Sequence, residues 1–146
     1  MLRQCAPLGS LRNDMRSYGH GSKRGSKSIV VVDDSEDLAS SLAVLLGLEG
    51  YTVRVALTGA AAMNVVVSSN ARAVLLDYQL PDMTGADVAM ALRADLRTRK
   101  VHIIMCTGTA EATVRERFTD YHAFLGKPVA PGDLMRSLDV AFAPRQ

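Results

Sequence analysis

The chain has 146 residues, of which 48% are hydrophobic, 22% charged and 5% aromatic, with 2 Cys and a formal net charge of +2. This length suits one ordinary domain with its own core, and the composition excludes a collagen-like chain, a disulfide scaffold and a wholly disordered polymer. Because no apolar run approaches the ~18 residues that a membrane-spanning helix needs, we expect no membrane contact.

Residues 1–27 differ in composition from the rest of the chain. They carry six basic side chains and one acidic side chain, whereas the remaining residues carry 11 basic and 14 acidic ones. We interpret them as a basic, disordered leader that precedes a folded body over 28–143 and a tail over 144–146. A transit peptide, a nucleic-acid contact and a true start at Met15 stay open as alternatives to a solvated leader. Because the leader lacks the apolar core of a secretory signal, we expect a cytoplasmic protein.

From Ser28 onward, short runs of strand-forming residues alternate with helical stretches. Strands are predicted over 28–33, 51–57, 72–77, 101–106 and 122–125. Helices are predicted over 36–48, 59–69, 85–96 and 110–118, with a last helix that starts at Pro131. Nearly continuous Val, Ile and Leu in the first, third and fourth strands indicate burial on both faces, whereas the alternation in the second indicates an edge strand. The pattern predicts an α/β fold with a parallel sheet and helices on both faces.

The spacing of apolar residues predicts which helix faces are buried. Leu92 and Leu96 lie four residues apart, which predicts an inward face for the third helix. Leu134, Leu138 and Phe142 have the same spacing in the last helix. The fourth helix has few large apolar residues, so we expect it to be the most exposed.

Polar residues stand at the ends of four predicted strands. Asp33 and Asp34 end the first strand, Asp77 ends the third, Thr107 follows the fourth, and Lys127 follows the fifth. In an open parallel sheet, ligands bind at the carboxyl ends of the strands, beside the point where the strand order reverses. We therefore expect these side chains to meet at one edge of the sheet.

Carboxylates placed this close together would raise one another's pKa unless a cation compensated their charge. Mg²⁺ binds one or two carboxylates and keeps positions for waters and phosphate oxygens. Lys127 and Thr107 add an ammonium and a hydroxyl, which suit phosphoryl oxygens. The set lacks a general base, and an Asp carboxylate can itself accept a phosphoryl group. The residues therefore indicate a carboxylate that accepts a phosphoryl group.

Each of these residues also has a purely structural interpretation when taken alone. The Asp33–Asp34 pair could cap the following helix, and Asp77 could belong to the turn before Pro81. The step from Lys127 to Pro128 is a common loop sequence. These interpretations do not account for all of the residues standing at the same end of the strands, so their joint occurrence favours a site.

Four motifs, IVVVDDSED, VLLDYQLPDMTG, IIMCTGTA and FLGKPV, together resemble the receiver domain of two-component response regulators over residues 28–143. The resemblance implies a flavodoxin-like, five-stranded parallel sheet of order 2-1-3-4-5. It also implies that Asp77 is phosphorylated by a histidine kinase or a phosphotransfer protein. Because only three residues follow the body, we expect a stand-alone receiver that acts on a downstream protein in trans, as a monomer or weak dimer.

The resemblance also implies roles for the residues of the site. Mg²⁺ would be held by Asp33, Asp34, Asp77 and the backbone carbonyl of Gln79. Thr107 and Lys127 would each contact a phosphoryl oxygen.

The resemblance further implies a switch at Thr107 and Phe124. Movement of Thr107 toward the phosphoryl group would let the Phe124 ring turn inward. That change would alter the output face of the fourth helix, fifth strand and fifth helix. Simple core packing is the alternative for Phe124.

Three other functions compete with this one. A haloacid-dehalogenase-like phosphatase also uses a strand-end Asp with Mg²⁺, but it needs a second Asp where this chain has Gln79. A phosphorylation-independent interaction module would not need the intact set of polar residues. Nucleic-acid binding through the leader lacks aromatic residues beyond Tyr18 and any recognisable fold, so we expect none.

Overall fold

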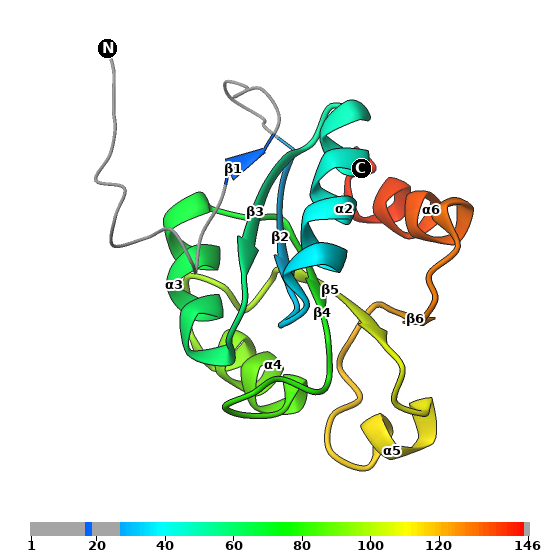
Figure 1. Cartoon of the computed structure of the whole chain (residues 1–146). Helices are drawn as coiled ribbons and strands as arrows, with labels where there is room; N and C mark the ends of the chain where they lie inside the picture. Colours follow the sequence, from blue (N-terminus) through cyan, green and yellow to red (C-terminus); the bar gives the residue numbers. More distant parts are fainter. Residues whose placement is uncertain (1–16, 19–26, 145–146) are drawn as a thin grey trace.

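The computed structural model describes residues 17–18 and 27–144 (Figure 1). The strands are β1 (Ser17–Tyr18), β2 (Ser28–Val32), β3 (Thr52–Ala56), β4 (Ala73–Leu76), β5 (His102–Thr107) and β6 (Ala123–Gly126). The helices are α2 (Glu36–Leu48), α3 (Gly59–Ser69), α4 (Gly85–Ala94), α5 (Glu111–Arg115) and α6 (Pro131–Ala141). Among the described residues, no helix combines the length and the apolar character needed to cross a bilayer.

The sheet confirms the predicted parallel order and adds one strand. Its order is β1-β3-β2-β4-β5-β6, and β2 to β6 run parallel, which is the predicted order 2-1-3-4-5. Strand β1 lies antiparallel beside β3, with Ser17 opposite Arg54 and Tyr18 opposite Val53. Strand β3, predicted as an edge strand, therefore has a neighbour on its outer side. Apart from Lys27, the rest of the predicted leader lies outside the described residues.

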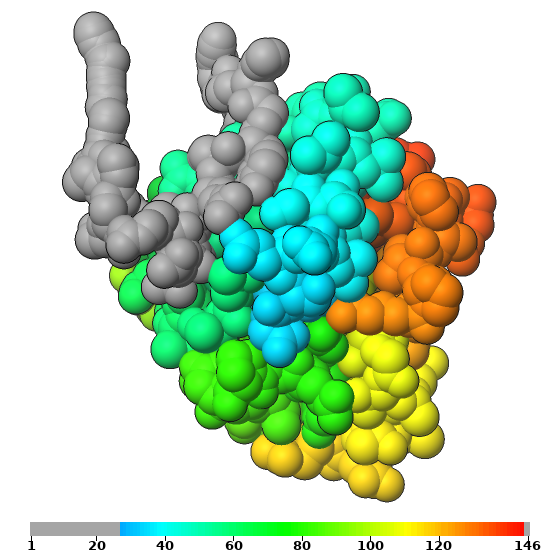
Figure 2. Space-filling model, viewed as in Figure 1, coloured from blue at the N-terminus to red at the C-terminus, as the bar shows by residue number. Residues whose placement is uncertain are grey.

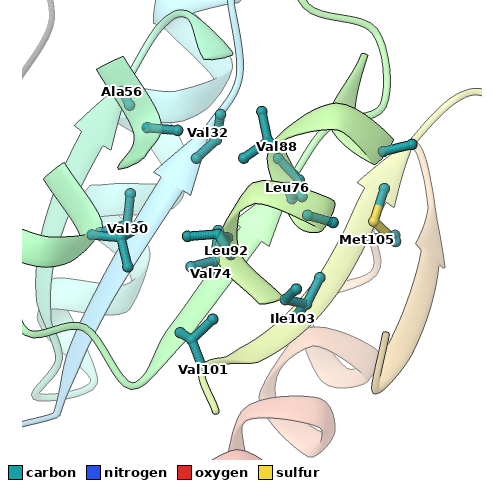
Figure 3. Close-up of a cluster of buried hydrophobic side chains, with 14 of the residues drawn as sticks. Val30, Val32, Ala56, Val74, Leu76, Val88, Leu92, Val101, Ile103 and Met105 are labelled. Atoms are coloured by element: carbon teal, nitrogen blue, oxygen red, sulfur yellow. The ribbon is translucent and has the colours of Figure 1, made fainter. Parts of the chain in front are cut away.

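Two apolar cores lie on the two faces of the sheet because alternate residues of a strand point to opposite sides. Val30 and Val32 of β2 join the core beneath α3 and α4, and Figure 3 shows them beside Val88 and Leu92 of α4. Ile29 and its alternate neighbours on β2 point the other way, toward α2 and α6. Helices α2 (cyan) and α6 (orange) lie side by side on the surface seen in Figure 2. This double burial is typical of central parallel strands.

Polar side chains fix the start of the first three helices. The Ser35 side chain accepts a hydrogen bond from the backbone N–H of Leu38, which caps α2. Thr58 caps α3 in the same way, and Thr84 and Asp87 form a reciprocal capping box at α4. Such caps satisfy backbone N–H groups that have no partner inside the helix. Helices α2 and α3 have the predicted bounds.

Two helices are shorter than predicted. Helix α4 ends at Ala94, and Leu96, predicted to face inward, is 79% exposed. The chain leaves the helix because Thr98 turns back and donates its buried hydroxyl to the Leu92 carbonyl at 2.7 Å. Helix α5 covers 111–115 rather than 110–118.

The last helix buries Leu134 and Leu138 as predicted. Phe142 follows its final turn and packs half-buried, with its ring 5.2 Å from that of Tyr51. The end of α6 is thereby held against the sheet near the start of β3.

Candidate functional site

Three polar side chains at the carboxyl ends of neighbouring strands make the same local turn. Asp33 accepts a hydrogen bond from the backbone N–H of Ser35 at 2.9 Å. Asp77 accepts one from the residue two positions later at 3.3 Å, and the Thr107 hydroxyl does so at 3.1 Å. Such a side-chain turn ends a strand and satisfies a loop N–H. It also holds each polar group at the edge of the sheet.

Lys127 joins these strand ends. Its backbone N–H donates to the Thr107 carbonyl at 2.9 Å, which places it at the end of β6. Its Nζ lies 2.6 Å from a carboxylate oxygen of Asp33 and 2.9 Å from one of Asp77. The two carboxylates are 4% and 9% exposed as side chains, and the lysine side chain is 23% exposed. One ammonium therefore bridges two almost buried carboxylates and offsets part of their negative charge.

Asp34 completes an acidic cluster with Asp33 and Asp77. One oxygen from each carboxylate lies within 4.8 Å of the other two. Asp34 is exposed, whereas the other two are buried, so the cluster opens to solvent on one side. Carboxylate oxygens that converge at this spacing suit a hard divalent cation such as Mg²⁺, with water or phosphate oxygens on the open side. The side chains present therefore fit the predicted ion.

Burial and the ion pairs shift the pKa values of Asp33 and Lys127 in opposite directions. Burial raises the pKa of Asp33 above its ordinary value, and the hydrogen bonds from Lys127 and Ser35 lower it in part. Burial alone would lower the pKa of Lys127, but its bonds to Asp33 and Asp77 outweigh burial and raise it. Lys127 therefore stays an ammonium at neutral pH.

The loop that follows Asp77 passes very close to the start of α4. A side chain at Gly85 would collide with the Asp77 carbonyl and lie 2.9 Å from the Tyr78 Cα atom. The Gly85 N–H also donates to the Tyr78 carbonyl at 2.6 Å. Glycine allows this approach because it has no Cβ.

Asp82 anchors the same loop to α3, a contact that no sequence motif predicted. Its carboxylate accepts hydrogen bonds from the N–H groups of Gly59 and Ala60, both at 2.8 Å. These contacts lower the pKa of Asp82, with the Gly59 bond as the largest cause. Asp82 is separated by more than twenty residues from the helix it caps, so no local pattern could have revealed the contact.

The other predicted residues lie at or near this edge without direct contact to the ion pair. The Gln79 side chain is exposed, and its backbone pairs with Thr84 across the loop. Thr107 is buried, and its hydroxyl bonds to the following turn. Phe124 on β6 is half-buried, with its ring 6.1 Å from that of Tyr121.

The family model for the response regulator receiver domain matches residues 29–139. The chain belongs to this family. The receiver domain is also 42% identical over 80 residues to the sensory transduction protein RegX3 of Mycobacterium tuberculosis, covering 55% of this chain and 34% of the relative. It is 31% identical over 114 residues to the phosphate regulon transcriptional regulatory protein PhoB of Pseudomonas aeruginosa, covering 77% of this chain and 50% of that protein. It thus spans half or less of these relatives' length.

Solved structures agree with this assignment. The receiver domain of a sensor histidine kinase from Pseudomonas aeruginosa, solved with a magnesium ion in its active-site cleft, is 26% identical with a TM-score of 0.74, and the match covers 82% of this chain and 99% of that one. A CheY-like receiver domain protein from Methanospirillum hungatei is 28% identical with a TM-score of 0.72, over 80% and 94% of the two chains.

As a receiver domain, this protein is a phosphoacceptor of two-component signal transduction rather than a classical enzyme, which removes the phosphatase alternative. Receiver domains work with histidine kinases, and an acidic triad like this one is typical of their Mg²⁺ sites.

Proposed function

We propose that this receiver domain accepts a phosphoryl group on the Asp77 carboxylate from a histidine kinase or phosphotransfer protein. The observation that carries the proposal is the double ion pair of Lys127 with Asp33 and Asp77 beside the exposed Asp34. Lys127 offsets part of the negative charge of the cluster, so the buried carboxylates can stay ionised. The exposed side at Asp34 leaves room for a ligand.

The strand order favours Asp77 as the acceptor. Strand β4, which leads to Asp77, lies between β2 and β5. A phosphoryl group on Asp77 therefore has the carboxylates of Asp33 and Asp34 on one side and the Thr107 hydroxyl on the other. Lys127 already contacts the acceptor carboxylate at 2.9 Å and needs only a small movement to reach a phosphoryl oxygen.

The transfer makes one bond and breaks one. A carboxylate oxygen of Asp77 attacks phosphorus, and the bond from phosphorus to the donor nitrogen of a phosphohistidine breaks. The bonding pair stays on that nitrogen, and the leaving group is a neutral imidazole because the other ring nitrogen carries a proton. Phosphoryl transfer depends mainly on in-line positioning and charge neutralisation. Asp33, Asp34, Asp77 and the Gln79 carbonyl would hold Mg²⁺, which neutralises charge on the phosphoryl oxygens when bound. Lys127 supplies a second positive charge, and Thr107 supplies a hydroxyl donor.

Labelling with acetyl phosphate tests this assignment. We expect Mg²⁺-dependent addition of one phosphoryl group, detected by intact mass, and we expect EDTA or the substitution Asp77→Asn to abolish it. Asp133→Asn is the matched control, since it removes an exposed carboxylate on α6 and should label like the wild type. Equal labelling of Asp77→Asn and wild type would show that the acceptor is another residue. No labelling of the wild type would favour a phosphorylation-independent interaction module.

We further propose that phosphorylation is signalled in trans through the face of α5, β6 and α6. Phosphorylation adds up to about two negative charges at Asp77. Thr107 would move toward them, and Phe124, which is only half-buried on the neighbouring strand, would move into the space. Phe124 lacks a hydroxyl, so the change would depend on packing alone.

A tryptophan reporter tests the switch, because the natural chain contains no Trp. The fluorescence of Phe124→Trp should change on addition of acetyl phosphate and Mg²⁺, and the change should vanish when Asp77→Asn is added. Tyr51→Trp, which lies just before β3 at the opposite end of the sheet and outside that face, serves as the control and should not respond. A silent reporter at 124 in a fully labelled protein would refute the proposed movement.

A further inference from the structure

The end of the sheet opposite the acidic cluster is basic. Arg72 immediately precedes β4, and Arg99 and Lys100 lie in the loop that leads into β5. Their side chains are exposed. Together with Arg97 and His102, they line a hollow of about 440 Å³ between this loop, the start of β4 and the end of α6. None of these residues takes part in the phosphoacceptor site.

Positive charge in this hollow is only partly compensated. Arg97 pairs with Asp95 at 2.7 Å, and the Arg72 guanidinium lies over the Phe142 ring at 4.7 Å. Neither Arg99 nor Lys100 has a side-chain ion pair with any residue that the structure describes. No carboxylate lines the hollow within that same part of the chain.

The loop that carries these cations is braced from behind. One guanidinium nitrogen of Arg93 donates to the carbonyls of Arg99 and Val101, both at 2.8 Å. The buried Thr98 hydroxyl holds the same loop to the end of α4. Figure 3 shows Val101 pointing into the core at the start of β5. A backbone held in this way loses little further entropy when the side chains that it carries bind a ligand.

Two histidines lie beside the hollow, and the pKa of each is lowered, mainly by burial and in part by the positive charge of Arg93. The rings of His102 and His122 stack with their centroids 3.7 Å apart. Burial, which is the largest cause, and the neighbouring His122 and Arg93 together lower the pKa of His102 to about 4. A bound anion would counter these effects, so the pKa of His102 is a built-in reporter of anion binding.

We propose that this basic hollow binds a small molecule with two adjacent phosphate groups. Its volume of about 440 Å³ falls in the usual range of small-molecule sites, about 300–1,000 Å³. That is more room than a single phosphate needs. Arginine forks suit phosphate oxygens, and Lys100 adds a point charge. Leu96, which is 79% exposed at the rim, offers an apolar contact to any attached organic group.

Calorimetric titration of the full chain in EDTA tests the proposal, because removal of Mg²⁺ keeps phosphates away from the acidic cluster. Inorganic pyrophosphate, ADP and adenosine are the ligands, and they distinguish a free diphosphate from one carried by a nucleoside. We expect saturable binding of pyrophosphate or ADP and none of adenosine. The double variant Arg99→Gln/Lys100→Gln should weaken binding about tenfold or more. In the wild type, the His102 ring protons should titrate at a higher pH once the ligand is bound.

The matched control is Arg117→Gln/Arg136→Gln, which removes two exposed cations away from the hollow. It should keep the wild-type affinity within about twofold, since distant surface charges contribute little. If both double variants lost the same amount of affinity, the loss would follow from the change in net charge alone, which would overturn the proposal. So would the absence of saturable binding at millimolar pyrophosphate and ADP, or tighter binding of a glutamate-rich peptide than of either.

Discussion

Replacement of Lys127 by methionine tests the central ion pair directly. Methionine has a similar length and no charge, so Lys127→Met leaves the carboxylates of Asp33 and Asp77 without their shared cation. These two side chains are only 4% and 9% exposed, so water cannot fully replace the lysine. The variant should therefore be less stable than the wild type in EDTA.

The structure sets the size of the effect. Removal of one partner from a buried ion pair costs about 3–5 kcal/mol. The lysine side chain is 23% exposed, which calls for the lower end, about 3 kcal/mol. For a domain of this size, that corresponds to a fall in Tm of about 10 °C. Arg136→Met, which breaks an exposed pair with Asp133, should cost less than about 1 kcal/mol.

Magnesium makes the prediction sharper. A divalent cation in the acidic cluster replaces the lost charge, so Mg²⁺ should stabilise Lys127→Met more than it stabilises the wild type. Thermal unfolding of both proteins measures this effect. The difference in Tm between the wild type and Lys127→Met should be smaller in saturating Mg²⁺ than in EDTA. If the difference is absent in EDTA, or unchanged by Mg²⁺, the ion pair does not hold these carboxylates as described.

Three further predictions concern the surroundings of the two ends of the sheet. Asp82→Asn should lower the free energy of unfolding by about 1 kcal/mol in urea, because a neutral amide caps α3 less well than a carboxylate, and an unchanged midpoint would contradict the contact. Thr98→Val removes the buried bond to the Leu92 carbonyl and should cost about 1–2 kcal/mol, with faster amide exchange in the loop into β5 than in β2. Because the pKa of His102 falls from 6.5 to about 4 in the fold, the unfolded chain binds the proton first and stability declines as pH drops through that window. Urea unfolding at pH 7 and 5 should differ by about 1 kcal/mol in the wild type, because His102 is partly exposed and solvent screens part of the effect, and by less in His102→Gln.

Local patterns predicted the parts of the fold whose causes are local. The apolar runs ending in Asp33 and Asp77 became buried strands because both faces of the sheet are covered by helices. Parallel topology then carried the strand ends to one edge, which is why the polar cluster could be foreseen from residues far apart in sequence. For Lys127, the resemblance implied only a contact with a phosphoryl oxygen. Its ion pairs with both Asp33 and Asp77 were not predicted.

The features that the sequence did not predict depend on contacts between residues that meet only in the folded chain. The apolar spacing at Leu96 continued the helical pattern. In the structure, however, the Thr98 hydroxyl donates a hydrogen bond to the Leu92 carbonyl, and α4 ends before Leu96. Strand β1 pairs two residues with β3, which is too short for any periodicity to show. The stacking of His102 on His122 depends on two strands that lie side by side only in the folded sheet.

The opposite charges at the two ends of the sheet should act independently. Strand β5 runs from His102 beside the basic hollow to Thr107 beside the acidic cluster. Six residues of strand separate its ends by about 16 Å, which is twice the screening length of about 8 Å at physiological salt. Groups at both ends face solvent, as Asp34 and Arg99 show. Their direct interaction is therefore below about 0.3 kcal/mol. With Mg²⁺ in excess, pyrophosphate should then have the same effect on the rate at which acetyl phosphate labels Asp77 in the wild type and in Arg99→Gln/Lys100→Gln. A rate that changed severalfold in the wild type, but not in Arg99→Gln/Lys100→Gln, would instead require a movement of β5 that links the two ends.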